Sequence, residues 1–214
     1  MLRGLHHPNI ARFQGWMVKL EDESWLRAKA VHAGCEGGRV MAYLNANSDA
    51  DRRNLVLGVC RGLSYLHSNK IVHGNLNPSN VHVDHNAGDR QPVPRISGFE
   101  SSYVVTNDLA NLKMEDTHYA PLRYTPPEVL AQPGVLCSQE GDIWSFGCTS
   151  SQMLLGKRPY ESIRNDYHIP SVVARHVDPY AWDSVDSFYE VLRSCLVHDP
   201  SRRTTSSDIA KRLE

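Results

Sequence analysis

The sequence predicts an α+β protein with a small N-terminal sheet and a larger, mostly helical C-terminal part. Segments 11–19 and 25–31 have the composition of two strands around the acidic turn 21–23. In the C-terminal part, apolar residues recur at helical spacing, as in the set Leu55, Val59, Leu63 and Leu66. With 214 residues, 41% of them hydrophobic, the chain is long enough for one large domain or two small lobes.

A glycine-rich connector at residues 33–38 joins the two predicted parts. It fits either a flexible turn between lobes or a phosphate-binding loop. A phosphate-binding loop would follow a strand and carry the pattern G-x-G-x-x-G, which is absent here. The flexible turn is therefore the favoured interpretation.

Helices and short strands follow this connector. Val40, Tyr43 and Leu44 fit a short amphipathic helix, and Asp49 is expected to cap the longer helix that contains Leu55. Strands are expected at 71–72 and 81–83, with a surface turn at 84–94 before the next strand. Further helices are expected at 142–155, 183–197 and 205–213.

Charge and composition exclude several classes of function. The formal net charge of -1 gives no reason to expect a nucleic acid or an anionic membrane as a partner. The histidines are scattered, which argues against a metal site. No run of eighteen apolar residues occurs, and Pro8 lies where a secretory signal would need its apolar core. The five cysteines lack a C-x-x-C pair, which favours reduced thiols and a cytoplasmic or nuclear location.

Residues 73–80 carry the most informative motif. Their sequence, His-Gly-Asn-Leu-Asn-Pro-Ser-Asn, resembles the protein kinase catalytic loop H-R-D-L-x-x-x-N in length and at both ends. In that loop the aspartate orients the attacking hydroxyl and accepts its proton, and the last asparagine holds magnesium. Asn75 stands in place of the aspartate, and a carboxamide has no basic oxygen at neutral pH.

Five further segments follow in the order of a protein kinase. Residues 95–100 resemble the strand and D-F-G segment, residues 123–128 resemble A-P-E, and residues 142–147 resemble the helix start D-x-W-S-x-G. Residues 156–160 and 199–203 resemble the loop after that helix and the D-P-x-x-R signature. By this resemblance the chain is identified as a member of the protein kinase-like superfamily, in its tyrosine-kinase-like branch.

The resemblance implies a protein kinase-like fold in two parts. Residues 1–38 would be a partial N-lobe with the end of helix αC, two strands and the hinge, and residues 39–214 would be the C-lobe. The family's glycine-rich lid, strand lysine and αC glutamate would all precede residue 1. Phosphoryl transfer relies on these parts for position and positive charge.

The resemblance also implies a degenerate catalytic site. Asn75 replaces the base and Gly98 replaces the metal-binding aspartate, whereas Asn80 is retained, and His73 begins the loop. A single neutral amide is a weak Mg²⁺ site, because this ion prefers carboxylate and phosphate oxygens. ATP and Mg²⁺, the cofactors that the family uses, are therefore expected to bind weakly or not at all.

A nucleotide site of the family type would use four residues of this chain. Ala33 and Cys35 lie in the hinge, His82 takes the strand position beneath the adenine, and Gly98 takes that of the metal ligand. The family has an aliphatic side chain where His82 stands, so an imidazole should fit the base less well. A satisfied polar strand residue is the favoured interpretation of His82.

The structural parts of the family are kept. The hydrophobic column that joins the lobes would consist of His73, Phe99, Leu2 and Phe13. Asp142 is expected to accept backbone N–H bonds from the loop that holds His73.

The resemblance also implies a buried ion pair and an activation segment. Glu128 and Arg203 are expected to form the ion pair beneath the activation segment. That segment, 100–125, carries several serines, threonines and tyrosines, and an ordinary mobile loop is favoured over a phosphorylated or docking segment. Gly74 lacks the arginine that would hold an activation-loop phosphate.

Three hypotheses for function remain open. The first is a pseudokinase that scaffolds or regulates a protein partner, such as a kinase or another signalling protein, without transferring phosphate. The second is a weakly active ATP-dependent serine/threonine or tyrosine kinase, seen as a fragment, in which Glu100 takes over metal binding. The third is a non-functional product of a truncated gene, with an uncovered strand edge that favours aggregation. The loss of both carboxylates favours the first.

Overall fold

The computed structural model describes residues 4–22, 25–32, 34–84, 91–105, 121–132, 134–182 and 186–214. The strands are β1 (Phe13–Asp22), β2 (Trp25–His32), β3 (Ile71–Val72), β4 (Val81–Asp84), β5 (Val93–Ile96) and β6 (Tyr103–Val104). The α-helices are α1 (Val40–Ala46), α2 (Arg52–Ser68), α3 (Pro127–Ala131), α4 (Gln139–Leu155), α5 (Ile169–Val173), α6 (Ser187–Cys195) and α7 (Ser206–Leu213). The predicted α+β class is confirmed.

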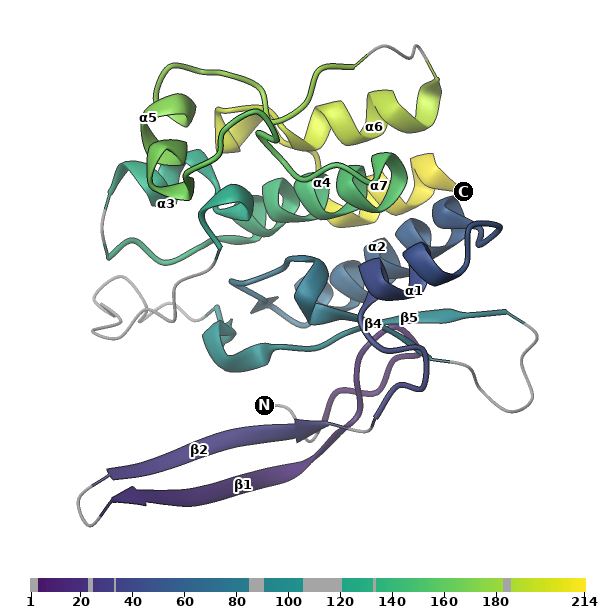
Figure 1. Ribbon diagram of the computed structural model, residues 1–214, viewed down its shortest axis with the longest axis vertical. Helices are drawn as coiled ribbons and strands as arrows, with labels where there is room; N and C mark the ends of the chain where they lie inside the picture. The colour runs from purple at the N-terminus through teal and green to yellow at the C-terminus, as the bar shows by residue number, and fades with distance from the viewer. Residues whose placement is uncertain are drawn as a thin grey trace.

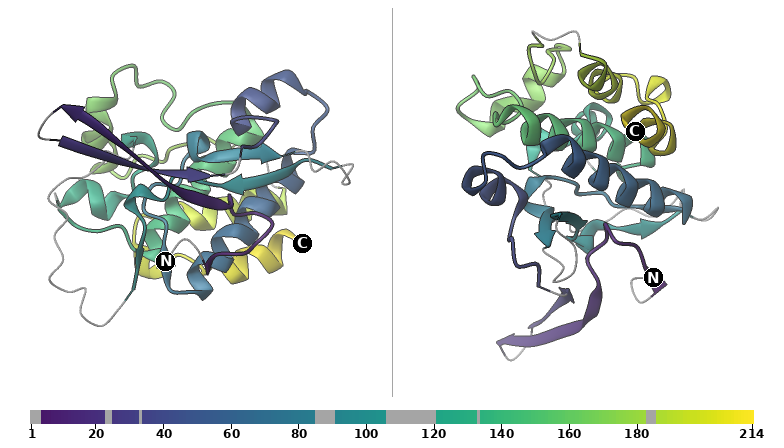
Figure 2. Two further views of the ribbon diagram at one scale, coloured as in Figure 1. Left: turned by 90° about the horizontal axis from the view of Figure 1, so that it is seen from below. Right: turned by 90° about the vertical axis from the view of Figure 1, so that its right-hand side faces the viewer.

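The helices form a stack on one side of the short strands. Three antiparallel strand pairs are present in the described residues: β1 with β2, β3 with β6, and β4 with β5. Helix α2 lies against β5, and α4, α6 and α7 pack beyond it (Figure 1). The β1–β2 hairpin projects from the opposite side of β4 and β5 (Figure 2). None of the helices in the described ranges has the length and apolar character needed to cross a membrane.

Helix α2 is the central element of the core. Its apolar stripe is fully buried at Leu55, Val59, Leu63 and Leu66, as predicted from their spacing. The prediction that Asp49 caps this helix is wrong. Asp51 is the cap, and its carboxylate accepts the N–H of Asn54 at 3.0 Å. A cap must lie directly before the first helical residue, Arg52, to reach the N–H groups of the first turn.

Several predicted boundaries shift because capping residues and tertiary contacts set them. Helix α4 begins three residues before the predicted position 142, since Ser138 caps it by accepting the Gly141 N–H at 3.2 Å. Helix α6 is shorter than the predicted 183–197, because Asp186 caps it and it ends at Cys195. Helix α7 starts one residue late, after its cap Thr205. The short helices α3 and α5 were not predicted.

The N-terminal strands also differ from the predicted ranges. Strand β1 starts later, at Phe13, and continues to Asp22 through most of the predicted acidic turn. Strand β2 extends one residue further than predicted, to His32. The charged side chains at 21–23 predicted a turn, but the strand continues to Asp22 because its backbone pairs with Trp25 of β2.

Two glycines of α2 allow the segment before β1 to pack closely on this helix. A Cβ on Gly58 would lie 2.5 Å from Cγ of Pro94, and a Cβ on Gly62 would lie 2.7 Å from the Asn9 carbonyl oxygen. The Asn9 amide donates to the Pro94 carbonyl at 2.9 Å. These contacts fix the base of the β1–β2 hairpin against α2 and β5, beside the cleft described below.

The predicted ion pair between Glu128 and Arg203 is confirmed. Both carboxylate oxygens of Glu128 accept from the guanidinium at 2.8 Å. The same guanidinium donates to the carbonyls of Val197 at 2.7 Å, Glu140 at 2.9 Å and His198 at 3.1 Å. Since Arg203 is almost fully buried, this side chain ties α3, the start of α4 and the loop after α6 together.

Replacing Arg203 by methionine should lower the free energy of unfolding by about 3 kcal/mol, because Glu128 and three carbonyls lose their donor. Urea unfolding followed by circular dichroism measures this change. The exposed neighbour Arg202 provides the control: Arg202→Met should change stability by no more than about 0.5 kcal/mol. Equal effects of the two substitutions would contradict the structural role of Arg203.

Candidate functional site

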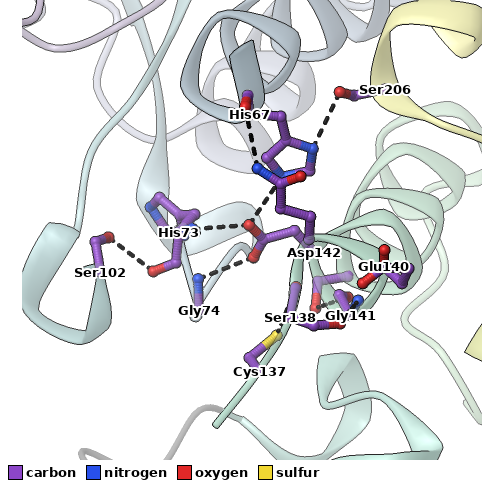
Figure 3. A network of polar contacts seen from close by, with 12 residues as sticks. His67, His73, Gly74, Ser102, Cys137, Ser138, Glu140, Gly141, Asp142 and Ser206 are labelled. Atoms are coloured by element: carbon purple, nitrogen blue, oxygen red, sulfur yellow. Dashed lines mark hydrogen bonds and ion pairs between the residues drawn. The ribbon is translucent and has the colours of Figure 1, made fainter. Parts of the chain in front are cut away.

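The loop 73–80 is held in place by the carboxylate of Asp142. This fully buried side chain on α4 accepts the backbone N–H of His73 at 2.7 Å and that of Gly74 at 2.8 Å (Figure 3). The His67 Nε2 lies 3.1 Å from the same carboxylate, and its Nδ1 lies 3.0 Å from the Ser206 hydroxyl. The predicted role of Asp142 is therefore confirmed, and His67 extends the network to α7.

His73 joins the loop 73–80 to the segment after β5. Its Nδ1 accepts the Asn75 N–H at 3.2 Å, so the proton lies on Nε2, which donates to the Ser97 carbonyl at 2.8 Å. Complete burial lowers the pKa of His73, although the Asp142 carboxylate acts in the opposite direction. The imidazole is neutral and has both nitrogens engaged, so it holds the backbone in place.

Position 75 presents an amide whose oxygen is already occupied. Nδ2 of Asn77 donates to the Asn75 carbonyl at 2.9 Å and to its Oδ1 at 3.0 Å. Nδ2 of Asn80 donates to the same carbonyl at 2.8 Å. Neutral amides therefore fill the loop, and none of these three side chains can accept a proton at neutral pH.

Gly98 and Asn80 are packed so closely that a side chain at position 98 would require the Asn80 amide to move. Gly98 has a left-handed backbone, with φ of 78° and ψ of 48°. A Cβ on it would lie 2.5 Å from the Asn80 Nδ2 and closer still to the other two amide atoms. The Asn80 backbone also accepts the Ser97 N–H at 2.8 Å, which holds the two segments together. A larger residue at position 98 would therefore have to displace this amide from its hydrogen bond with the Asn75 carbonyl.

Most predicted site residues line one cavity of about 350 Å³ between the hairpin and the helical stack. Cys35, Asn80, His82 and Gly98 all contribute to its lining. His73 and Asn75 do not line it, but they support Asn80 through the hydrogen bonds above. Ala33 lies outside the described residues.

Sequence reasoning missed several lining residues, among them His32, Arg39 and Ser97. His32 is the last residue of β2, and Arg39 precedes α1 and pairs with His82 in an isolated antiparallel bridge. The sequence offered one signal for Arg39: it directly follows the connector 33–38. A residue next to a hinge between two lobes is expected to lie near the cleft between them. Glu100 is exposed, and it also lines the cavity.

The cleft carries few charges at neutral pH. Burial, followed by the positive charge of Arg39, lowers the pKa of His82. Burial also lowers the pKa of His32, although a backbone hydrogen bond with Ala11 and the charge of Glu100 oppose this effect. Both imidazoles are therefore largely neutral at pH 7. Of the described residues that line the cavity, only Arg39 and Glu100 carry a formal charge.

A column of rings connects the hairpin to the loop 73–80. The ring centroids are 6.0 Å apart for Phe13 and His32, 5.6 Å for His32 and Phe99, and 5.2 Å for Phe99 and His73. Phe13 thus reaches Phe99 through His32, which was not predicted to belong to the column. Leu2, the fourth predicted member, lies outside the described residues.

The segment after Phe99 packs directly on Gly74. Gly74 has φ of 77°, and a Cβ on it would lie 2.7 Å from the Ser101 carbonyl oxygen. The Ser102 hydroxyl donates to the His73 carbonyl at 2.7 Å. Tyr103 donates its hydroxyl to the Cys137 carbonyl at 2.6 Å, so this phenol is engaged. Of the other candidate phosphorylation sites, those at 106–120 lie outside the described residues.

Stability should fall as the pH is lowered from about 7 to about 5. Burial is the largest cause of a lowered pKa at five histidines: His7, His32, His73, His82 and His198. Below about pH 6.5 the unfolded chain binds more protons than the folded chain, so protonation favours unfolding. Thermal melting across this range measures the effect, and His82→Leu should reduce the slope. A melting temperature that is constant or rises towards acid pH would contradict this account.

Gly98→Ala should destabilise the protein by about 3 kcal/mol, because strain from the left-handed backbone adds to the overlap with the Asn80 amide. Gly156→Ala is the matched control: Gly156 has φ of 71° but nothing within 4 Å of an added Cβ, so only the strain of about 1–2 kcal/mol applies.

A double-mutant cycle isolates the overlap. Asn80→Ala should recover about 1–2 kcal/mol of the loss in the Gly98→Ala background, because it removes the amide atoms that the Cβ meets. Additive effects of the two substitutions in urea unfolding would show that the two residues do not compete for the same volume.

Comparison with known proteins identifies the family. The profile of the protein tyrosine and serine/threonine kinase family matches residues 1–213. Mitogen-activated protein kinase kinase kinase 2 of Arabidopsis thaliana is 29% identical over 216 residues, which cover 99% of this chain and 31% of the relative. Mitogen-activated protein kinase kinase kinase 12 of Rattus norvegicus is 27% identical over 217 residues, covering 100% of this chain and 23% of the relative.

A third relative, mitogen-activated protein kinase kinase kinase A of Dictyostelium discoideum, is 26% identical over 224 residues, which cover 99% of this chain and 21% of the relative. The chain thus spans about a third or less of the length of these curated relatives. The family match extends over nearly all of its residues and includes both the helical stack and the cleft. The chain belongs to the protein tyrosine and serine/threonine kinase family.

Proposed function

We propose that this chain is a pseudokinase domain, which keeps the protein kinase fold and acts in signalling through a protein partner without efficient phosphoryl transfer. The lack of a carboxylate at positions 75 and 98 carries this proposal. Asn75 supplies no base, and Gly98 has no side chain that could hold a metal ion beside Asn80.

The size of the expected catalytic loss supports this proposal. General-base assistance contributes about 10²–10⁴-fold to a reaction rate, and the metal ion adds charge stabilisation and positioning. Asn75 and Gly98 together remove the groups that would provide both. ATP and Mg²⁺ are therefore proposed to bind weakly or not at all in the manner of an active kinase.

Retention of the scaffold supports a role in binding a protein. Asp142 and Arg203 keep their full sets of hydrogen bonds, although the groups that they once helped to position are gone. The relatives are kinases named for the mitogen-activated cascade, so the proposed partner is a kinase or another protein of such a cascade. We further propose a partial N-lobe at 1–38, a C-lobe at 39–214, a place in the tyrosine-kinase-like branch, and a cytoplasmic or nuclear location.

One observation favours a second candidate function, a weakly active ATP-dependent kinase. Glu100 lines the cavity beside Asn80 and Gly98, and its carboxylate is exposed. Glu100 lies in the 3-10 turn Phe99–Ser101, two residues after position 98, where the family has its metal-binding aspartate. Its carboxylate could take over the role of that aspartate only if this turn shifted. The contact of the Phe99 ring with His73 opposes such a shift.

A phosphate-transfer assay on the full-length protein separates the two functions. With radiolabelled ATP, Mg²⁺ and a generic acceptor protein, we expect no transfer above that of an Asn80→Ala variant. Mg²⁺-dependent transfer that is lost in Glu100→Gln and kept in Glu161→Gln, an exposed glutamate outside the cleft, would establish the weak kinase and refute the pseudokinase.

A further inference from the structure

We propose that Ser206 and His67 form a hydrolytic site for small uncharged esters in a second cavity of the helical stack. This cavity, called the α7 cavity below, has a volume of about 350 Å³ and lies between the last turns of α2, the start of α4 and residues 203–207. It shares no described lining residue with the cleft between the hairpin and the helical stack. The inference goes beyond the proposed function and does not rest on it.

His67 lies between a buried carboxylate and a serine hydroxyl (Figure 3). Its Nε2 is 3.1 Å from a carboxylate oxygen of Asp142, and its Nδ1 is 3.0 Å from the Ser206 hydroxyl. An ionised carboxylate can only accept, so in the neutral imidazole the proton lies on Nε2 and Nδ1 accepts from Ser206. His67 and Ser206 are both largely buried, yet both border the α7 cavity.

The three side chains have the arrangement of a nucleophile, its general base and the group that orients the base. Both distances fall within the range of about 2.6–3.2 Å that is typical of such pairs. The serine contacts Nδ1 and the aspartate contacts Nε2, which is the reverse of the order in chymotrypsin. Either ring nitrogen can accept a proton when the other carries one, so the roles are unchanged. Asp142 would stabilise the positive charge that develops on His67 when this residue takes the serine proton.

The first turn of α7 supplies donors for the negative charge that develops on the ester oxygen. Ser206 and Ser207 are the first two residues of this helix, and their N–H groups have no acceptor within it. The next two N–H groups are engaged by Thr205: its hydroxyl accepts from Asp208 at 3.2 Å, and its carbonyl accepts from Ile209 at 3.0 Å. In α/β-hydrolases the N–H of the residue after the nucleophile stabilises the oxyanion. That residue is Ser207 here, and it lines the α7 cavity.

The lining of the α7 cavity favours a short, uncharged ester. Most of its described members carry hydroxyl or amide groups, and Ile143 is the one aliphatic side chain among them, so a long acyl chain would bury little apolar surface. Glu140 adds a negative charge, whereas Arg203 is already paired with Glu128, so an anionic substrate would be repelled. The volume of about 350 Å³ is at the lower end of the range of roughly 300–1,000 Å³ for small-molecule sites. An acetyl ester fits these limits.

The proposed reaction consumes one ester and one water molecule and releases a carboxylic acid and an alcohol. The Ser206 oxygen attacks the carbonyl carbon while its proton passes to Nδ1 of His67. The bond between the carbonyl carbon and the alcohol oxygen then breaks, and His67 returns the proton to that oxygen, which leaves the acyl group on Ser206. Water attacks the acyl-serine with the same imidazole as base, and the serine hydroxyl is restored.

Hydrolysis of p-nitrophenyl acetate by the full-length protein tests this proposal. Release of p-nitrophenol should be at least about tenfold faster than in Ser206→Ala or His67→Gln, because general-base assistance contributes about 10²–10⁴-fold. Mass spectrometry of acid-quenched samples should find one acetyl group on Ser206. The exposed residues Ser171 and His168 lie outside the described lining, and Ser171→Ala and His168→Gln should keep the wild-type rate. A wild-type rate in Ser206→Ala or His67→Gln, or an acetyl group found only on other residues, would overturn the proposal.

A second measurement needs no variant. An alkyl fluorophosphonate transfers its phosphonyl group to an activated serine oxygen and releases fluoride, so it should label Ser206 in the unmodified full-length protein. Heat denaturation separates Ser206 from His67 and should abolish the labelling. Absence of the label on Ser206, or equal labelling of the folded and the denatured protein, would refute the proposal even where Ser206→Ala fails to fold.

The outcome is separable from that of the proposed function. The ester assay contains neither ATP nor Mg²⁺, and it reports on residues that do not line the cleft. A protein that fails to hydrolyse the ester would refute this inference and leave the pseudokinase proposal standing.

Discussion

The buried carboxylate of Asp142 is the interaction on which the arrangement of the cleft depends. It accepts two successive backbone N–H groups of the loop 73–80 and contacts His67, with no exposure to solvent. A buried charge with this many donors cannot lose them without a large cost in free energy, so the loop keeps its course whatever side chains it carries. The loop 73–80 therefore keeps its backbone course while its side chains at positions 75, 77 and 80 are neutral amides.

Exchange of carboxylates for amides and glycine changes the electrostatics of the whole cleft. In a protein kinase the acidic residues are balanced by a metal ion and by the phosphates of the nucleotide. Here Asn75, Asn77 and Asn80 satisfy one another through hydrogen bonds, so this side of the cleft needs no cation. The remaining charges lie elsewhere, on Arg39 and Glu100, and two neutral imidazoles lie in the same cavity.

The order of the motifs predicted the fold, the Asp142 anchor and the Arg203–Glu128 pair. Each of these features depends on residues that lie within a motif, so the resemblance to the family predicts their roles. The cap of α2 was misplaced by two residues, since two nearby aspartates have the same propensity and only the helix start decides between them. The packing of Asn80 on Gly98 was not predictable. It depends on how closely two distant segments approach in three dimensions, and no spacing in the sequence records that distance.

Gly74 and Gly98, two of the glycines with a left-handed backbone, restrict the substitutions that this site can accept. At position 74 the space beside the backbone is occupied by the Ser101 carbonyl, and at position 98 it is occupied by the Asn80 amide. A larger residue at position 74 would meet the backbone of Ser101, and one at position 98 would have to displace the Asn80 side chain. A carboxylate at position 98 would therefore require a rearrangement of Asn80 at some cost in stability. The packing around these two glycines thus limits which substitutions the fold tolerates next to the loop 73–80.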